Sequence, residues 1–325
     1  MPRVKVLGLL ALLALTTCGR AQPSAGAPSR FPPFPQRARG GTSQAFSRVW
    51  FSGDAELARY RAVVPRYGEP RDAELVLIYV TEPMDRRTWI KDDDVRGDDR
   101  VGVLKLNVSL KFTTGVYPYS VFTSVFSPYG DWGRERFSPV KITLTAQEWC
   151  GHVFHGIWPG EDRFTSQLLS YFAQEGETRT EVPTARGALY EDALMIQLRE
   201  LDGPFAGGGD WRGELVPSLW RTRRRHRGGG PEPATITRER ATVDGVEANR
   251  FTLRYGDIER VFDVEAGGAH RLLGWRTRDG ETARLERSVR MPYWRLNHNA
   301  DLPQRAALGL EVPPAPAPVE GPVGN

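Results

Sequence analysis

The feature that most constrains this chain is the stretch from Val101 to His155, in which two segments show a two-residue alternation of apolar and polar side chains. The alternating apolar positions are Leu104, Leu106, Val108, Leu110 and Phe112, followed later by Val140, Ile142, Leu144 and Ala146. Successive side chains of a strand point to opposite faces, so this pattern predicts strands with one buried and one solvated face. Residues 117–126 lie between them and are rich in aromatic and β-branched side chains, which favour a third strand. We therefore expect a meander of three antiparallel strands.

Further segments of strand character continue on both sides of this meander. They are residues 73–81, 153–157, 164–172, 215–220, 235–240, 249–255, 259–264, 272–277 and 283–289. Turn pairs such as Asp244-Gly245 and Asp279-Gly280 separate the last of them at hairpin spacing. Only two stretches predict helices: 55–60, with Asp54 as N-cap, and 188–201, whose mostly apolar stripe packs against the sheet. The predicted fold class is mainly β: an antiparallel meander curved into a half-barrel or a sandwich, with one packed α-helix.

The chain begins with a secretory pattern. Arg3 and Lys5 precede an apolar run from Val6 to Leu15, and this run is too short to span a bilayer, which needs about 20 apolar residues. The run ends in Leu-Thr-Thr-Cys18, which resembles a bacterial lipoprotein box, in which the cysteine is lipidated and becomes the mature N-terminus. The alternative is ordinary cleavage after Ala21. Both alternatives predict export, either as a lipoprotein on the periplasmic face of a bacterial membrane or as a protein secreted to the periplasm.

Composition predicts the division of the chain into segments. We expect a signal peptide over 1–18, a disordered tether rich in Pro, Gly and Arg over 19–45, a β-rich folded domain over 46–311 with a sub-boundary near 203–234, and a disordered Pro-rich tail over 312–325.

The net charge limits the partners that the chain is expected to bind, and the cysteine content limits what can stabilise its fold. The formal net charge is +4, but six basic and no acidic residues precede Phe46, which leaves 38 basic and 40 acidic residues in the rest. The folded part is therefore nearly neutral, and no nucleic-acid partner is expected. If Cys18 is lipidated or removed, Cys150 has no intrachain partner, so the core and not a disulfide must stabilise the fold.

Seven segments resemble a family of exported bacterial proteins, familiar from Bacteroidetes, that often carry the label septum formation inhibitor Maf. The segments are Trp50-Phe-Ser-Gly53, Arg66-Tyr-Gly-Glu69, Val76-Leu-Ile-Tyr-Val-Thr-Glu82, Val103-Leu-Lys-Leu-Asn107, Thr114-Gly-Val-Tyr-Pro-Tyr-Ser120, Gln147-Glu-Trp-Cys-Gly151 and Leu272-Leu-Gly-Trp275. The resemblance implies an exported β-rich family. True Maf proteins are α/β nucleotide pyrophosphatases with an N-terminal Ser-rich and Arg-rich phosphate-handling motif, and this sequence lacks that motif.

One stretch, Gln147-Glu-Trp-Cys-Gly-His152, has residue types that suit catalysis. If strand parity continues from Val140, then Glu148, Cys150 and His152 point inward, where His152 would lower the thiol pKa, Cys150 would attack and Glu148 would orient the imidazole. The alternative is a bulge that resets parity, which buries Trp149 and makes Cys150 a small apolar filler. The five histidines fit no zinc template, so we expect no metal ion and no cofactor.

Three functional hypotheses follow, in order of preference. The first is an exported, lipid-anchored, non-enzymatic envelope protein that binds an apolar ligand, a lipid or a protein partner, with Tyr117, Tyr119 and Trp149 as candidate ligand contacts and a membrane surface reached through the N-terminal lipid. The alternative is a thiol-dependent hydrolase or transferase centred on Cys150. A Maf-like nucleotide pyrophosphatase is third, and only the family label favours it.

Overall fold

The computed structural model describes residues 34–199, 205, 208–226 and 229–314, and its strands form a 16-stranded sheet. The strands are β1 (Ala55–Arg66), β2 (Glu69–Asp85), β3 (Ile90–Lys91), β4 (Arg100–Thr114), β5 (Tyr117–Pro128), β6 (Lys141–Glu148), β7 (Gly151–Pro159), β8 (Arg163–Ser170), β9 (Glu177–Pro183), β10 (Leu189–Tyr190), β11 (Trp211–Val216), β12 (Glu232–Val243), β13 (Val246–Tyr255), β14 (Ile258–Glu265), β15 (Leu272–Thr277) and β16 (Thr282–Met291). The helices are α1 (Gln44–Trp50), α2 (Leu194–Gln197) and α3 (Leu219–Arg225), and the 3-10 helices are η1 (Gly97–Asp99), η2 (Glu191–Ala193), η3 (Tyr293–Arg295) and η4 (Asn299–Leu308).

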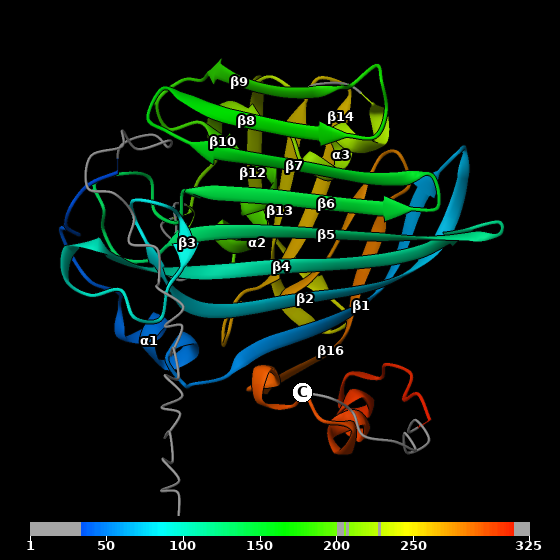
Figure 1. Cartoon of the computed structure of the whole chain (residues 1–325). Coiled ribbons are helices and arrows are strands. Elements are labelled where there is room, and N and C mark those ends of the chain that lie inside the picture. The colour runs from blue at the N-terminus through cyan, green and yellow to red at the C-terminus, as the bar shows by residue number, and fades with distance from the viewer. Residues whose placement is uncertain (1–33, 200–204, 206–207, 227–228, 315–325) are drawn as a thin grey trace, which may run out of the picture.

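The sheet is antiparallel except where β10 pairs with β11 in parallel. Its strand order runs from β10 through β16, then β1 and β2, then β4 through β9, with β3 beside β2. The end strands β9 and β10 do not pair with each other, so the sheet is open. It curls so that β12–β14 lie behind β4–β8, with α2 and α3 between the two layers (Figure 1).

The predicted mainly β, antiparallel architecture is confirmed. The alternating apolar positions of β4 and β6 face the main core, where Leu104, Leu106, Ile142 and Leu144 are fully buried. The hairpins predicted in the last third of the chain are present as β12 to β16. One continuous sheet also runs through the region of the predicted sub-boundary near 203–234.

Of the two helix predictions, the one over 55–60 is wrong, and the one over 188–201 is confirmed only in its middle. Residues 55–60 belong to β1, because this segment pairs along its length with β2 on one side and β16 on the other, and these pairings outweigh its helical propensity. Residues 188–201 do not form one helix. The chain passes through β10 and then, without a break, through η2 and a single turn of α2, and residues 200–204 lie outside the described residues. Its stripe does pack into the core, as expected: Tyr190, Leu194 and Leu198 belong to the main apolar cluster.

The basic run after Trp220 is of a kind that usually forms a solvated loop, but here it is helical. Residues 219–225 form α3, which His226 ends in a left-handed conformation at φ 50°. The strand predicted over 215–220 accordingly ends at Val216, where β11 stops. Because α3 lies inside the curl of the sheet, several of its arginines point into the protein and not into solvent, and Arg221 is only 4% exposed.

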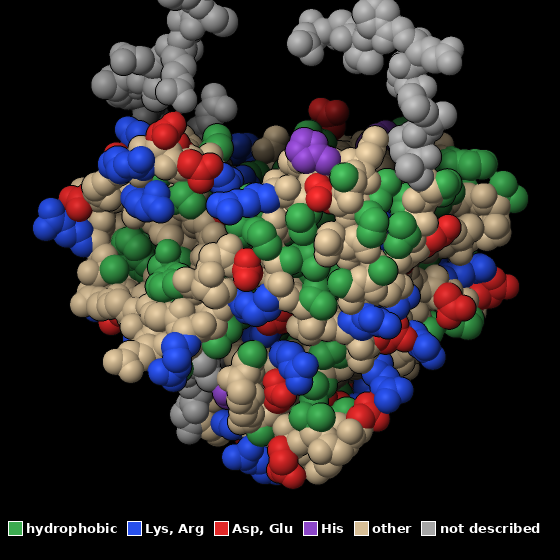
Figure 2. All heavy atoms as spheres, turned by 90° about the horizontal axis from the view of Figure 1, so that it is seen from below, with side chains coloured by type: hydrophobic (Ala, Val, Ile, Leu, Met, Phe, Trp, Pro, Cys, Tyr) green, Lys and Arg blue, Asp and Glu red, His purple; other side chains and the backbone are tan. Residues whose placement is uncertain are grey.

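Two small apolar clusters cover the outer face of the sheet. In one, Phe34 packs edge-on against Trp89 with ring centroids 4.9 Å apart, and in the other Leu308 of η4 covers β1 and β2. Residues from Phe34 onward thus contact the folded domain, so the predicted tether over 19–45 ends earlier than expected. Residues 1–33, including Cys18, and most of the predicted tail, 315–325, lie outside the described residues. Seen from below, charged side chains of both signs are interspersed with apolar ones (Figure 2).

Candidate functional site

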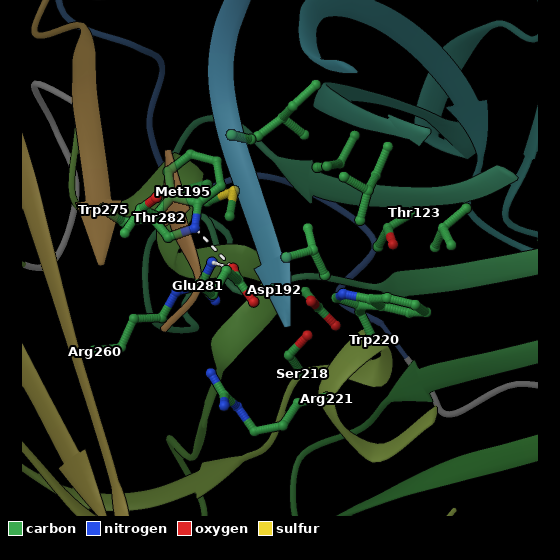
Figure 3. Close-up of a pocket in the computed structure, with 16 residues that line it drawn as sticks. Thr123, Asp192, Met195, Ser218, Trp220, Arg221, Arg260, Trp275, Glu281 and Thr282 are labelled. Atoms are coloured by element: carbon green, nitrogen blue, oxygen red, sulfur yellow. Dashed lines mark hydrogen bonds and ion pairs between the residues drawn. The ribbon is translucent and has the colours of Figure 1, made fainter. Parts of the chain in front are cut away.

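The concave interior of the sheet encloses a cavity of about 50 Å³. One wall is apolar and comes from β1, β2, β4 and β5, with side chains of Ala62, Val64, Leu75, Val108, Leu110 and Val121. The other wall is polar and comes from η2, α3 and the strands β14 to β16, with side chains of Asp192, Ser218, Arg221, Arg260 and Glu281. In Figure 3, Asp192 and Ser218 lie between Arg260 and Glu281 on one side and Trp220 on the other. The cavity is therefore amphipathic.

Glu191 is the centre of the charge network behind the polar wall, and it is fully buried. Its Oε1 accepts hydrogen bonds from Arg260 Nη1 at 3.0 Å and from Arg221 Nη2 at 3.4 Å. Its Oε2 accepts from the Tyr255 hydroxyl at 2.6 Å and from the Ser218 N–H at 3.0 Å. Burial alone would raise the pKa of Glu191, but Arg221 and Arg260 outweigh it and hold that pKa at about 2. Glu191 is thus ionised throughout the neutral range.

The network continues to the start of β16. Glu281 Oε1 accepts from Arg260 Nη2 at 3.2 Å and from the indole N–H of Trp275 at 2.8 Å. Asp279 accepts from Arg224 Nη2 at 2.9 Å. The network as a whole pairs three arginines with three carboxylates, and mutual pairing of this kind is what allows buried charges to persist.

Several buried N–H groups of residues that line the cavity have no hydrogen-bond acceptor among the described residues. Nε and Nη1 of Arg221 and the indole N–H of Trp220 are buried and make no hydrogen bond to any described residue, although Arg221 Nη1 faces an Asp279 oxygen at 3.5 Å. Buried donors normally find partners, so these atoms are available to water or to a ligand oxygen. The volume suffices for a few ordered waters, at roughly 10–15 Å³ for each.

Asp192 adds a titratable group to this wall. Its carboxylate accepts from the Leu219 N–H at 2.9 Å, and the residue as a whole is half-buried. Burial raises the pKa of Asp192 to about 6, an effect to which the neighbouring charge of Glu191 adds. Two consecutive carboxyl groups therefore have pKa values shifted in opposite directions.

A series of aromatic rings connects the cavity with the edge of the sheet. Trp149 and Tyr117 have ring centroids 6.2 Å apart, and Tyr117 and Tyr119 are 5.8 Å apart. Tyr119 stacks on Phe112 at 4.8 Å, and Phe112 lies 6.1 Å from Trp220, which lines the cavity. The structure therefore brings together the three candidate ligand contacts, Tyr117, Tyr119 and Trp149, and extends them inward. Tyr119 is only 5% exposed, and Trp149 is 71% exposed.

The sequence-based geometry of the Cys150 cluster is wrong in both of its forms. β6 ends at Glu148, Trp149 and Cys150 form a two-residue turn, and β7 begins at Gly151, so the strand parity is not continued. Trp149, Cys150 and His152 are all exposed. Trp149 is therefore not in the core, and Cys150 is not a buried filler.

The thiol of Cys150 also lacks an activating partner. No hydrogen bond within the described residues joins it to His152, and its hydrogen bond with Glu148, together with the Glu148 charge, raises the thiol pKa. Glu148 Oε2 instead accepts from the Cys150 N–H at 2.7 Å and so stabilises the turn. A thiol with a raised pKa is a poorer source of thiolate, which is the opposite of what nucleophilic catalysis requires.

Sequence reasoning missed most of the charged wall. Arg260 shares strand parity with the buried Ile258, Phe262 and Val264, so its inward position was readable from the alternation alone. Glu191 lies near the start of the segment 188–201, whose apolar stripe predicts a helix, and Arg221 belongs to a basic run of the kind that usually forms a solvated loop. No sequence signal indicated that these three side chains meet.

Comparisons with protein-family models, with curated proteins and with solved structures returned no match for this chain. The resemblance to the Maf-labelled exported family stays a prediction from the sequence. No helix in the described part of the chain is both long and apolar enough to cross a membrane. Across those same residues, His, Cys, Asp and Glu side chains form no group of three or more that could hold a metal ion.

Proposed function

We propose that this chain is an exported, non-enzymatic envelope protein that binds an amphipathic ligand inside its curved sheet. The observation that carries the proposal is the two-sided cavity: aliphatic side chains on one wall, and on the other wall buried donors of Arg221 and Trp220 that lack acceptors. Ligand sites combine a mostly apolar lining with a few placed polar groups in this way. An aliphatic chain with an oxygen-bearing head group suits both walls.

Binding requires the walls to move, because ligand sites usually measure about 300 Å³ or more and this cavity is far smaller. Two lining side chains suit such movement. Met195 is unbranched and adapts its shape readily, and Trp220 forms the boundary between the cavity and the smaller pocket beneath the hairpin tips. Displacing Trp220 would join the two spaces and give the ligand a route along the aromatic series.

Calorimetric titration with dodecanoate tests this function, with dodecyltrimethylammonium as a probe of equal chain length and opposite charge. We expect dodecanoate to bind and the cation to bind at least tenfold more weakly, because the free groups on the polar wall are donors. Val121→Phe, which fills the cavity, should weaken dodecanoate binding at least tenfold. Phe122→Ala, on the outward side of the same strand, is the matched control and should leave the affinity unchanged. Equal binding of both probes, or no effect of Val121→Phe in a folded protein, contradicts the proposal.

Export and anchoring are part of the same proposal, and the N-terminal sequence supports them: a short apolar run followed by Cys18. Mass spectrometry of the mature protein from membranes is the test. We expect a diacylglyceryl adduct on Cys18 as the first residue. An unmodified chain starting at Gln22 overturns the anchor and leaves simple secretion, and an intact precursor in the cytosol overturns both.

A further inference from the structure

Four hairpins of the sheet end in exposed apolar residues at the same end of the strands, here called the hairpin edge or simply the edge. The turns β1–β2, β4–β5, β6–β7 and β8–β9 lie at one edge because antiparallel strands alternate in direction, and they appear at the right of Figure 1. Their outermost large residues are Tyr67, Val116, Trp149 and Tyr171, here called the apolar tips, which are 59%, 79%, 71% and 63% exposed. Among the described residues, four of the five most exposed large apolar side chains are these tips, and the fifth, Ile90, lies at the opposite end of β2.

The other turns at this edge are polar. They carry Gly256-Asp257 and Asp279-Gly280, which connect β13 to β14 and β15 to β16. Asp and Gly are what such turns ordinarily contain. The apolar tips are therefore a property of one half of the edge and not of hairpin turns in this protein generally.

Tyr67 has a left-handed backbone conformation, which is unfavourable for a bulky side chain. It has φ 56° and precedes Gly68 at φ 77°, in a two-residue turn that usually begins with Asn or Asp. The β12–β13 hairpin has the same turn with Asp244 at φ 52° and Gly245 at φ 81°. A bulky residue held in a strained position is a reason to look for a function of its side chain.

Contacts between the hairpins support the tips. Tyr171 packs over Gly151, where an added Cβ would lie only 2.6 Å from the tyrosine ring, so Gly151 is what allows these two neighbouring tips to approach. The Tyr67 hydroxyl lies 2.7 Å from that of Tyr119, and the Arg66 guanidinium lies 4.3 Å from the Tyr67 ring centroid. Tyr67 and Tyr171 are thus held in place by contacts with their own and neighbouring hairpins.

From these observations we propose that the apolar tips insert into the interfacial region of a lipid bilayer and dock this edge of the sheet on the membrane. Tyr and Trp have an apolar ring with a polar group, which suits the level of the lipid head groups. Four separate protruding tips match a soft surface better than a groove or a flat protein interface. Charged residues nearby pair with one another, such as Arg225 with Asp257 and Arg71 with Glu69, so ring insertion and not net charge drives the docking.

The chain supplies its own reporter for this docking. Cys18→Ser leaves Cys150 as its single thiol, and Cys150 is exposed beside Trp149 at one tip. An environment-sensitive dye on Cys150 of the full chain should shift to shorter emission wavelengths when phosphatidylcholine vesicles are added, and nitroxide-labelled lipid should quench it. We expect the same binding with and without phosphatidylglycerol, and less than a twofold change between 50 and 500 mM salt.

Two variants separate the tips from apolar exposure in general. Asn at all four tips should weaken vesicle binding at least tenfold, whereas Asn at Phe51, Ile90 and Trp294, which are exposed elsewhere, should change it less than twofold. Both variants keep the N-terminal apolar run, so any contribution of that run is common to them. An unshifted dye, equal losses in the two variants, or a steep salt dependence overturns the proposal. Self-association that the tip variant abolishes, without vesicle binding, would assign the edge to a second copy of the chain. Dodecanoate binding in solution is measured separately, so the docking can fail while the cavity function stands.

Discussion

Both halves of the sheet contain antiparallel hairpins, but they differ in the side chains that face the interior and in the residues of their turns. In one half, β1, β2, β4 and β5 line the cavity with apolar side chains, and the hairpins of β1 to β9 end in the apolar tips. In the other half, β13, β14 and the turn before β16 contribute Tyr255, Arg260 and Glu281 to the interior, and the turns at the same edge consist of Asp and Gly. Because the sheet curls, these unlike faces lie opposite each other. The difference teaches that the amphipathic interior needs two things: a few charged side chains such as Arg260 among the apolar inward residues of their strand, and a curl of the sheet that brings them opposite the apolar wall.

The largest effect should come from the charged half. Glu191→Leu leaves two buried arginines without their shared partner, so we expect a loss of about 3–5 kcal/mol in the free energy of unfolding. Glu286→Leu removes a more accessible partner of Arg59 and Arg61 and should cost no more than about 1 kcal/mol. Urea denaturation measures both, and equal losses would mean that the buried network does not stabilise the fold.

The second prediction concerns the apolar wall, for which the expected loss in the free energy of unfolding is slightly smaller. Leu110 is 6% exposed and lines the cavity, and Leu110→Ala should lower the free energy of unfolding by about 2–5 kcal/mol because the lost side chain enlarges an existing void. The outward Leu169, which is 41% exposed, is the control, and its replacement by Ala should cost well under half as much. If the two variants unfold at the same urea concentration, the apolar wall is not a packed surface.

The third prediction uses the pH dependence of Asp192. Its pKa in the folded protein is about 6, above the usual value of 3.8, so between these two values the folded state keeps a proton that the unfolded chain has lost. Stability attributable to Asp192 therefore falls as pH rises through this window. Asp192→Asn removes that dependence, keeps an acceptor for the Leu219 N–H, and should stabilise the protein at pH 7 by at most about 3 kcal/mol.

Urea midpoints between pH 3.5 and 7.5 measure this effect as the difference between variant and parent. Glu191 behaves in the opposite sense, because its pKa of about 2 lies below the usual 4.5, and its contribution is lost as pH falls through that interval. A constant difference between Asp192→Asn and the parent across the range would show that Asp192 ionises normally.

The smallest expected effect compares the two equivalent turns. Asp244→Tyr places an aromatic residue in a left-handed position without the partners that Tyr67 has, and it should cost about 1 kcal/mol. Tyr67→Asp relieves the strained position but loses the contacts with Tyr119 and Arg66, so it should change stability by less than about 1 kcal/mol. Thermal unfolding of both variants is the measurement, and a larger loss for Tyr67→Asp would mean that Tyr67 is required for folding.

The sequence predicted those parts of the fold that depend on local alternation. The meander, the hairpins of the last third and the burial of Leu104 and Ile142 follow from side-chain period and turn residues. Residues 55–60 were mispredicted because their helical propensity is local, whereas one of their two strand partners, β16, lies more than 220 residues away. The aromatic candidates Tyr117, Tyr119 and Trp149 were found because they lie close together on consecutive hairpins.

The charged wall could not be predicted for the same physical reason. Glu191, Arg221 and Arg260 come from three separated elements, and an ion pair between distant residues leaves no periodic trace in the sequence. The Cys150 cluster shows the converse error: three suitable residue types lie close together in sequence, but the two-residue turn after Glu148 leaves Cys150 and His152 exposed and does not form the expected inward-facing site. Residues close in sequence formed a common cluster in the structure only where the strands kept their side chains on the same side.

The absence of pairing between β9 and β10 has a mechanical consequence. In a closed cylinder, strand number and stagger fix the width of the interior, but in a curled open sheet the two layers can separate without breaking any backbone hydrogen bond. The helical elements η2, α2 and α3, here called the clasp, then connect the two layers. Glu191 pairs with Arg260 of β14, and Arg199 pairs with Glu56 of β1. An occupant larger than the present cavity could be accommodated by a slight opening of this clasp, while every strand keeps its neighbours.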